Sequence, residues 1–424
     1  MNIGKADMPK QLDLASLASV LPPSGTTYVQ GCSGESLLLA ESVRVAGSAL
    51  GGMTFTGIFV PGLNRYDYLA NPACRVRSFF MTPELKKVGA AVDFLPLCYA
   101  DILANLKMTP IDAALVMLSP PDADGLCSFG PIVDFLPDLW PKIPKLIAHI
   151  NPALPRTRGT PGIPYQNLTA IVEAEQNLLG QGDEKPDEDA REIATHIARL
   201  VPDGATLQVG LGKIPGAVLR ALTGRKNLRI HSGLISEAVL ELADAGALAN
   251  GVAITGGVAI GGPALYAACC GPAFEFRPVS HTHDAKVIAG LSHFISINSA
   301  LEVDLFGQAY AECGPKGLMS GPGGASDFAR GGKIGGLRIV ALPSSASSGA
   351  KSRIVAPGEA SGPVSLGRME VDVVVTENGC ADLRGIGHEA RAQKLIAIGA
   401  RQHRDKLAES WRQMAERLEK GGKA

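Results

Sequence analysis

The segment GATLQVGLGKIP, residues 204–215, decides the fold class. Residues 206–209 predict a buried strand, the glycines at 210 and 212 a tight turn, and the apolar residues 217–222 a helix. The same order occurs 179 residues earlier: GTTYVQG (residues 25–31) leads through CSG into an apolar helical stretch over residues 36–46. Strand, glycine turn and helix in that order are typical of parallel α/β proteins. The chain is therefore predicted to contain two similar α/β domains.

A polar, acidic linker separates the two similar halves. It reads GQGDEKPDE over residues 180–188 and precedes a predicted helix at 190–200. The 424 residues exceed the usual size of one domain, so we predict an N-terminal domain at 1–185 and a C-terminal domain at 186–424. Further buried strands are predicted at 113–118, 145–150, 170–172, 338–342 and 371–376, and one or two surface helices at 390–418.

Composition excludes several classes of function. Apolar residues make up 46% of the chain and the formal net charge is -1, which gives no electrostatic reason to bind nucleic acid or an anionic membrane. The eight cysteines lack a C-x-x-C spacing, so we expect reduced thiols. Charged Lys5, Asp7, Lys10 and Asp13 argue against a signal peptide, and no long apolar run predicts a membrane span. We expect a cytoplasmic protein.

Two glycine-rich segments are candidate anion sites. In GLGKIP, the turn Gly210–Pro215, backbone N–H groups and a helix N-terminus would face a phosphate. The third glycine of a dinucleotide fingerprint is absent, and Pro215 is predicted to begin the helix, which disfavours a nicotinamide cofactor. In SGPGGASDFARG (residues 320–331), consecutive glycines would expose amides to an oxyanion, and Asp327 with Arg330 would orient the loop. A packing turn and a surface loop are the structural alternatives.

Three other segments have a structural and a functional interpretation. SPPDADGLCSFG (residues 119–130) predicts a rigid turn after a strand. Glu302 and Asp304 would share one face of a strand, as an acid–base pair or as a solvated strand edge. His281 and His283 would share a strand face, but no third ligand can be placed, so no metal site is predicted.

Together these segments resemble the acetyl-CoA hydrolase/transferase family, the class I CoA-transferases that include 4-hydroxybutyrate CoA-transferase. The resemblance runs from about residue 25 to residue 401. Its elements are SPPDADGLCSFG (119–130), NPALPRT (151–157), GATLQVGLGKIP (204–215), NSALEVDLFGQ (298–308), SGPGGASDFARG (320–331), SRIV (352–355) and TENGCADLRG (376–385).

The resemblance implies two tandem NagB/CoA-transferase-like open parallel-sheet domains and a homodimer. It implies a ping-pong reaction between an acyl-CoA and a small carboxylate such as acetate, without a permanently bound cofactor. A glutamate attacks the acyl-CoA, and the anhydride is converted to a glutamyl-CoA thioester that passes CoA to the second carboxylate. By the same resemblance Gly210, Leu211, Gly212, Lys213 and Ile214 bind CoA. Gly323 and Gly324 lie against the thioester, with Glu302 close by.

The resemblance fails at the nucleophile. The family's typical Ile-His-Thr-Glu is matched here by Ile230, His231, Ser232 and Gly233, so the position of the catalytic glutamate holds a glycine. Glu237, four residues later, is predicted to lie in the first turn of the next helix, where its negative charge would interact favourably with the helix dipole.

Three hypotheses follow, in order of preference. The first is a CoA-transferase that uses another carboxylate, Glu237 or Glu302, or a direct route. The second is an acyl-CoA thioesterase in which water occupies the space left by the glutamate, with His231 or Glu237 as general base. The third is a non-catalytic CoA-binding subunit.

Overall fold

The computed structural model describes residues 8–13, 16–64, 68, 71, 73–88, 91–182, 184–314 and 317–420. The charges at Lys5 and Asp7, used above against a signal peptide, lie outside these residues. The chain forms two compact units. The first is Met1–Gly182 with Gly233–Ile235 and Ile254–Thr282; the second is Asp183–Ser232, Ser236–Ala253 and His283–Ala424. The prediction of domains at 1–185 and 186–424 stays a prediction.

The first large sheet has eight strands in the order β1-β10-β8-β6-β2-β3-β4-β5, and every neighbouring pair is parallel. Such a sheet has both faces covered, so its central strands are continuous apolar runs; β6, AALVML, is buried at every position. The strands are β1 (Lys10–Gln11), β2 (Gly25–Val29), β3 (Met53–Gly57), β4 (Arg75–Ser78), β5 (Val92–Phe94), β6 (Ala113–Leu118), β8 (Lys145–Ile150) and β10 (Ala170–Glu173).

The second large sheet has the order β14-β13-β12-β11-β15-β20-β24-β25. Strand β11 pairs in parallel with β12 and β15, the ladder continues in parallel to β20 and β24, and β25 is antiparallel. The strands are β11 (Thr206–Val209), β12 (Arg229–Ile235), β13 (Ile254–Ala259), β14 (Phe274–Phe276), β15 (Phe294–Ser299), β20 (Leu337–Ala341), β24 (Val373–Thr376) and β25 (Gly379–Asp382).

Seven strands of each sheet follow the same order, which confirms the predicted duplication, and only the outermost strands β1 and β25 differ. In the first sheet, the strand before the glycine turn, β2, lies between β3 and β6. In the second sheet, the corresponding strand β11 lies between β12 and β15. The predicted strands at 113–118, 145–150 and 206–209 have these bounds in the structure. Those predicted at 170–172, 338–342 and 371–376 are present with ends shifted by one or two residues.

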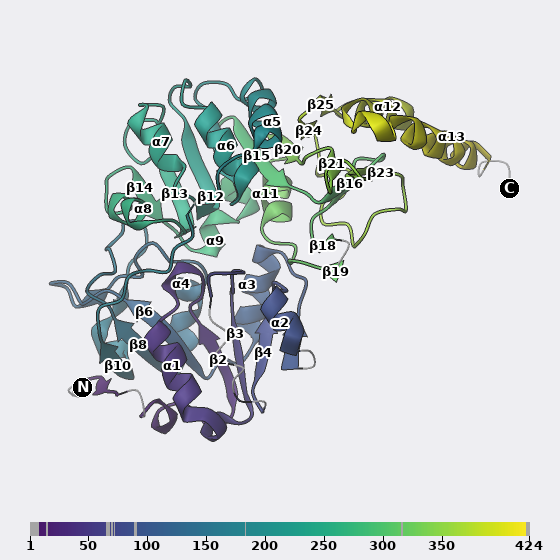
Figure 1. The fold of residues 1–424 in the computed structure, drawn as a ribbon. Coiled ribbons are helices and arrows are strands. Elements are labelled where there is room, and N and C mark those ends of the chain that lie inside the picture. The colour runs from purple at the N-terminus through teal and green to yellow at the C-terminus, as the bar shows by residue number, and fades with distance from the viewer. Residues whose placement is uncertain are drawn as a thin grey trace. The chain divides into compact units, whose positions relative to one another are not determined.

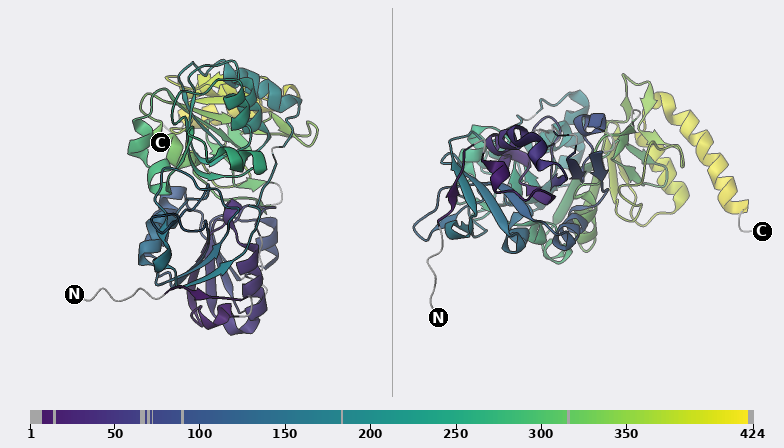
Figure 2. Two further views of the ribbon diagram at one scale, coloured as in Figure 1. Left: turned by 90° about the vertical axis from the view of Figure 1, so that its left-hand side faces the viewer. Right: turned by 90° about the horizontal axis from the view of Figure 1, so that it is seen from below.

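Helices cover the sheets (Figure 1). In the first unit these are α1 (Leu37–Ala46), α2 (Pro83–Val88), α3 (Tyr99–Met108), α4 (Leu136–Leu139), α8 (Pro263–Ala268) and α9 (Val279–Thr282). In the second they are α5 (Glu188–Ala198), α6 (Lys213–Ala221), α7 (Val239–Asp244), α10 (Ala285–Ala289), α11 (Ala325–Gly331), α12 (His388–Ile398) and α13 (Arg404–Lys420). The predicted C-terminal surface helix is the pair α12 and α13 (Figure 2).

Capping sets where two of the helices begin. The Ser36 side chain accepts a hydrogen bond from the Leu39 N–H at the start of α1, and Asp187 accepts one from the Ala190 N–H at the start of α5. Helix α5 therefore begins inside the predicted linker. Helix α6 begins at Lys213, after Gly212, so the prediction that Pro215 begins this helix is wrong. Proline is tolerated there because N–H groups in the first turn of a helix have no intrahelical partner.

Two local predictions are corrected by the fold. His281 lies in the short helix α9 and His283 follows it, so the two do not share a strand face. The predicted strand with Glu302 and Asp304 exists as β16 (Glu302–Asp304), but it pairs on both sides, with β17 (Ala309–Tyr310) and β23 (Ile354–Val355). It is therefore not a solvated edge. Among the described residues, no helix is long and apolar enough to cross a membrane.

Candidate functional site

The turn from β11 into α6 is the predicted CoA-binding segment, Gly210–Ile214. Apart from its chain neighbours, a Cβ added at Gly210 or at Gly212 would meet no atom of the described residues within 4 Å, so packing in this part of the chain does not require either glycine. Gly212 has φ +111°, which disfavours any side chain. Lys213 is exposed and its Nζ lies 3.2 Å from Asp187 Oδ2. The turn thus presents open space and the N–H groups of a nine-residue helix, an arrangement that suits an anion.

A reciprocal pair of amides fixes the strand ends beside this turn. Gln208 Nε2 donates to Asn298 Oδ1 at 3.3 Å, and Asn298 Nδ2 donates to Gln208 Oε1 at 3.1 Å. The two residues lie on neighbouring strands, β11 and β15. Because Gln208 is buried, these bonds satisfy polar groups that water does not reach, and they hold the carboxyl ends of both strands in register.

His231, His283 and Gly324 come together in the second unit. His231 on β12 and His283 after α9 are both buried. A Cβ added at Gly324 would lie 2.6 Å from His283 Nε2, so only glycine fits against the ring. The ring also packs on Phe328 of α11, with centroids 4.7 Å apart. Burial, and then the neighbouring His231, lower the pKa of His283 to about 3, so this imidazole is neutral at physiological pH.

The glycine loop leads directly into α11. Gly323 has φ +63° and Gly324 is the N-cap residue. Arg330 pairs with Glu370 at 3.1 Å, and Asp327 is buried. The structure therefore anchors Arg330 to the segment before β24, a partner that sequence spacing did not identify.

The two candidate replacement carboxylates differ in their surroundings. Glu302 accepts hydrogen bonds from the backbone N–H and the hydroxyl of Ser361, at 2.7 and 2.8 Å. Glu237 lies half-buried in the turn between β12 and α7, so the prediction that it lies in the first turn of this helix is wrong, because α7 begins at Val239. No hydrogen bond or ion pair joins its carboxylate to another described residue. Glu302 is therefore held by the protein, whereas Glu237 is available.

Gly233, the position where the family's glutamate is expected, lies half-buried on β12. The backbone of Gly233 packs closely against that of Gly257 in the first unit. A Cβ added at Gly257 would lie only 2.9 Å from the Gly233 carbonyl oxygen. The N–H groups of Val133 and Asp134 donate to the Gly257 carbonyl at 3.0 and 3.3 Å.

Asp134 is a buried carboxyl that sequence reasoning missed. It is 7% exposed, has φ +43°, and its carboxyl makes no hydrogen bond with another described residue. Burial raises its pKa to about 8. Burial and the nearby Asp134 raise the pKa of Tyr28 and of Cys32. The residues around it give no sequence signal, because they come from distant segments.

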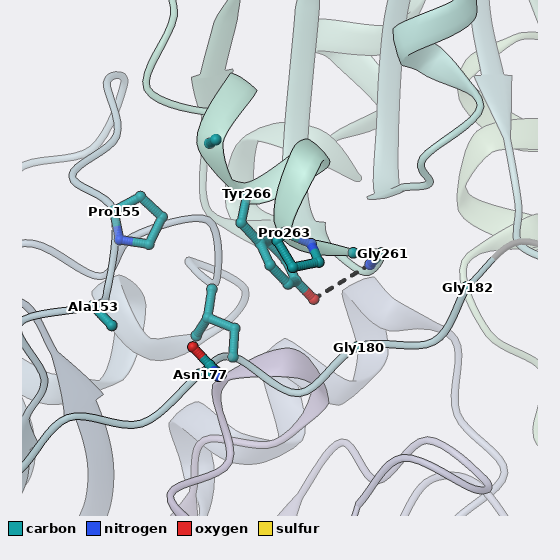
Figure 3. Close-up of a pocket in the computed structure, with 11 residues that line it drawn as sticks. Ala153, Pro155, Asn177, Gly180, Gly182, Gly261, Pro263 and Tyr266 are labelled. Carbon is teal, nitrogen blue, oxygen red and sulfur yellow. Dashed lines mark hydrogen bonds between the residues drawn. The ribbon is translucent and has the colours of Figure 1, made fainter.

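A cavity of about 470 Å³ lies within the first unit (Figure 3). None of the described residues that line it is charged. Tyr266 forms one wall, and its hydroxyl accepts from the Gly261 N–H at 3.3 Å (Figure 3). The same hydroxyl donates to the Leu179 carbonyl at 2.5 Å. The Ile260 N–H donates to the Ile235 carbonyl at 2.9 Å, which ties this wall to the end of β12. The lining suits an uncharged organic group.

The remaining motifs are structural or carry no ligand set. The turn after β6 is held by Arg156, which pairs with Asp122 and donates to Ser119 Oγ at 2.8 Å, as expected for a rigid turn. Within the described ranges, no group of three histidine, cysteine, aspartate or glutamate side chains is placed to hold a metal ion.

A family model and a curated relative identify the family of this chain. The sequence model described as acetyl-CoA hydrolase/transferase C-terminal domain matches residues 261–411. The 4-hydroxybutyrate coenzyme A transferase of Clostridium kluyveri is 37% identical over 328 residues, covering 74% of this chain and 76% of that protein.

Two solved structures share the architecture. A variant of RipA superposes with a TM-score of 0.89 at 26% identity, covering 96% of this chain and 98% of that one. The 4-hydroxybutyrate CoA-transferase of Porphyromonas gingivalis gives a TM-score of 0.80 at 29% identity, covering 96% and 98%.

The duplicated sheet and the match to solved CoA-transferase folds define a CoA-transferase-like α/β protein. The chain belongs to the acetyl-CoA hydrolase/transferase family. Enzymes of this family use CoA thioesters as substrates rather than as permanently bound cofactors.

Proposed function

We propose that this enzyme transfers CoA from an acyl-CoA to a small carboxylate such as acetate, as a cytoplasmic homodimer. Family membership supports CoA transfer or thioester hydrolysis in general, and the relative from Clostridium kluyveri is named a transferase. The open turn at Gly210–Ile214 supports binding of CoA, because α6 supplies N–H groups for a phosphate.

The route cannot place a covalent intermediate on Gly233, which has no side chain. Glu237 is the proposed nucleophile, and the observation that carries this choice is that its carboxylate is uncommitted, whereas both oxygens of Glu302 are bound by Ser361. A Glu237 oxygen attacks the thioester carbon and CoA leaves as the thiolate. The thiolate then attacks the glutamyl carbonyl of the anhydride and releases the first acid, and the acceptor carboxylate takes over CoA by the reverse steps.

His283 and the glycine loop have supporting roles in this proposal. The N–H groups around Gly323 and Gly324 would stabilise the oxyanion of each tetrahedral intermediate, an effect worth roughly 3 kcal/mol per donor. The neutral His283 ring packs against Gly324 and fixes the loop, so these groups need no reorganisation during the reaction.

The uncharged cavity beside Tyr266 is proposed to receive the acyl group. An ionised second carboxylate would be buried there without a positive partner, which is costly. We therefore expect monocarboxylic acyl-CoAs to be preferred over dicarboxylic ones such as succinyl-CoA.

Hydrolysis is the second candidate. The observation that favours it is the glycine at 233, which offers no side-chain nucleophile and lies two residues beyond the buried His231 on the same strand. In this route His231 or Glu237 would remove the proton from the attacking water.

One experiment separates the routes. The purified protein is incubated with butyryl-CoA, with and without acetate, and both free thiol and acetyl-CoA are measured. Acetyl-CoA formed only with acetate, with little free thiol, supports transfer. Thiol release that does not depend on acetate makes the enzyme a hydrolase, and CoA binding without any product makes it a binding subunit.

A further inference from the structure

A second cavity, of about 400 Å³, lies within the second unit and carries an excess of positive charge. Its lining includes Arg330, at the carboxyl end of α11, Lys333 just beyond it, Arg338 on β20, and Arg368. Glu370 is the only carboxylate among the described lining residues.

The two nearby carboxylates are already engaged by the protein. Glu370 Oε1 accepts from Arg330 Nε at 3.1 Å and from Ser326 Oγ at 3.2 Å, while Oε2 accepts from the Gly367 N–H at 2.9 Å. Asp372 binds Arg338 through both oxygens, at 2.7 and 2.9 Å. Arg330 and Arg338 are therefore neutralised within the fold.

Lys333 and Arg368 remain without a counter-charge. Both are exposed, and neither side chain forms an ion pair or hydrogen bond with another described residue. Burial, and then the charge of Arg368, lower the pKa of the neighbouring Arg391. Among the described residues, the Arg391 guanidinium donates hydrogen bonds only to backbone carbonyl oxygens. Positive charges therefore repel one another here, and an anion would relieve this repulsion.

We propose that this cavity binds a small phosphate-bearing ligand, with Lys333 and Arg368 as its principal contacts. A guanidinium and an ammonium that line one cavity can both donate to the oxygens of a phosphate, and charge-assisted bonds of this kind are about twice as strong as neutral ones. The volume is within the range of small-molecule sites. The exposed Met369 side chain supplies one apolar contact for the organic part of a phosphate ester.

This site is separate from the one proposed for CoA. It lies where α11 ends and β20 begins, whereas the glycine loop Gly323–Gly324 lies where α11 begins and the turn at Gly210 lies at the carboxyl end of β11. The proposal does not depend on the reaction catalysed, so its test measures binding rather than activity.

The test is isothermal titration of the full-length protein with inorganic pyrophosphate at constant ionic strength, with CoA saturating its own site. The variant is Lys333→Ala/Arg368→Ala. The control, Lys406→Ala/Arg417→Ala, removes the same two charges from exposed positions on α13. We expect saturable binding to the unaltered protein and the control, and at least about tenfold weaker binding to the variant, because two charge-assisted contacts are lost.

Two results would overturn the proposal: no saturable binding of pyrophosphate, or equal binding by variant and control. Tighter binding of citrate than of phosphate, pyrophosphate and AMP would contradict the phosphate class. Lys333→Gln alone, at a single exposed position, is expected to give an intermediate affinity, which separates loss of a ligand contact from a general change in folding.

Discussion

His283 Nε2 occupies the place where a side chain at residue 324 would begin: an added Cβ on Gly324 would lie 2.6 Å from it. The glycine in the loop is therefore required by a ring from a segment about forty residues earlier in the chain. The contact couples the glycine loop to the buried histidine pair and underlies the first prediction.

Gly324→Ala should lower the free energy of unfolding by roughly 1–3 kcal/mol, because the methyl group overpacks against the ring. It should also reduce the catalytic rate, because the loop must shift. Denaturant unfolding and steady-state kinetics measure the two effects. Gly210→Ala is the control for stability, because its Cβ would meet nothing within 4 Å. Combining Gly324→Ala with His283→Ala should cost less than the two single changes added together; strict additivity would refute the contact.

Asp134 should make stability fall as pH rises. Its pKa is about 8 in the folded protein and near the ordinary value of 3.8 when unfolded. Between these values the unfolded chain loses a proton that the folded protein keeps, so the loss of stability grows through this window and is complete above about pH 8. Asp134→Asn removes the titration and should be more stable at pH 7 by up to about 4 kcal/mol.

Denaturant unfolding at pH 5, 7 and 8 measures this effect. Asp124→Asn, at an exposed loop position, is the control and should follow the unaltered protein. An Asp134→Asn curve parallel to that of the unaltered protein across this range would show that Asp134 is ionised in the folded state.

Glu237→Gln should reduce CoA transfer by at least about a hundredfold, because an amide cannot form the acyl anhydride. Glu302→Gln should retain activity within about tenfold, because that carboxylate serves to bind Ser361. Borohydride trapping followed by peptide mass analysis locates any glutamyl-CoA adduct. An adduct on Glu302, or equal loss of activity in both variants, would eliminate Glu237 as the nucleophile.

Ala267→Phe should fill part of the uncharged cavity and raise KM for butyryl-CoA by about tenfold or more, with a smaller effect for acetyl-CoA. Ala264→Phe is the matched control, because Ala264 is exposed on the same helix α8 but does not line the cavity. Steady-state kinetics with both substrates provide the measurement. Identical KM values for the two variants would place the acyl group elsewhere.

Short sequence patterns were sufficient to predict most of the strands and helices. The apolar run at 113–118 and the strand–turn–helix at 204–215 predict elements that the structure contains, because a buried parallel strand is apolar along its whole length. The repeat spaced by 179 residues predicts the shared strand order of the two sheets.

Predictions failed where an individual residue's partners decide its role. His281 and His283 have the spacing of a strand face, but the backbone there forms α9 and a cap. Glu302 and Asp304 alternate as at a solvated edge, yet β16 is paired on both sides and Asp304 is buried. The spacing of charged residues along a strand does not show whether the strand pairs with other strands on one side or on both.

The sequence by itself determined the fold class, the duplication, the glycine turn at residues 210–212 and the glycine at 233, because each depends on residues that are close in sequence. The tertiary structure alone decided that Ser361 binds Glu302, that residue 324 must be glycine and that burial raises the pKa of Asp134. It also decided that Lys333 and Arg368 form no ion pair with another described residue. Burial and charge pairing arise from segments far apart in the chain: Ser361 binds Glu302 across 59 residues. Shifts in pKa and the pairing of charges therefore arise only once the chain has folded.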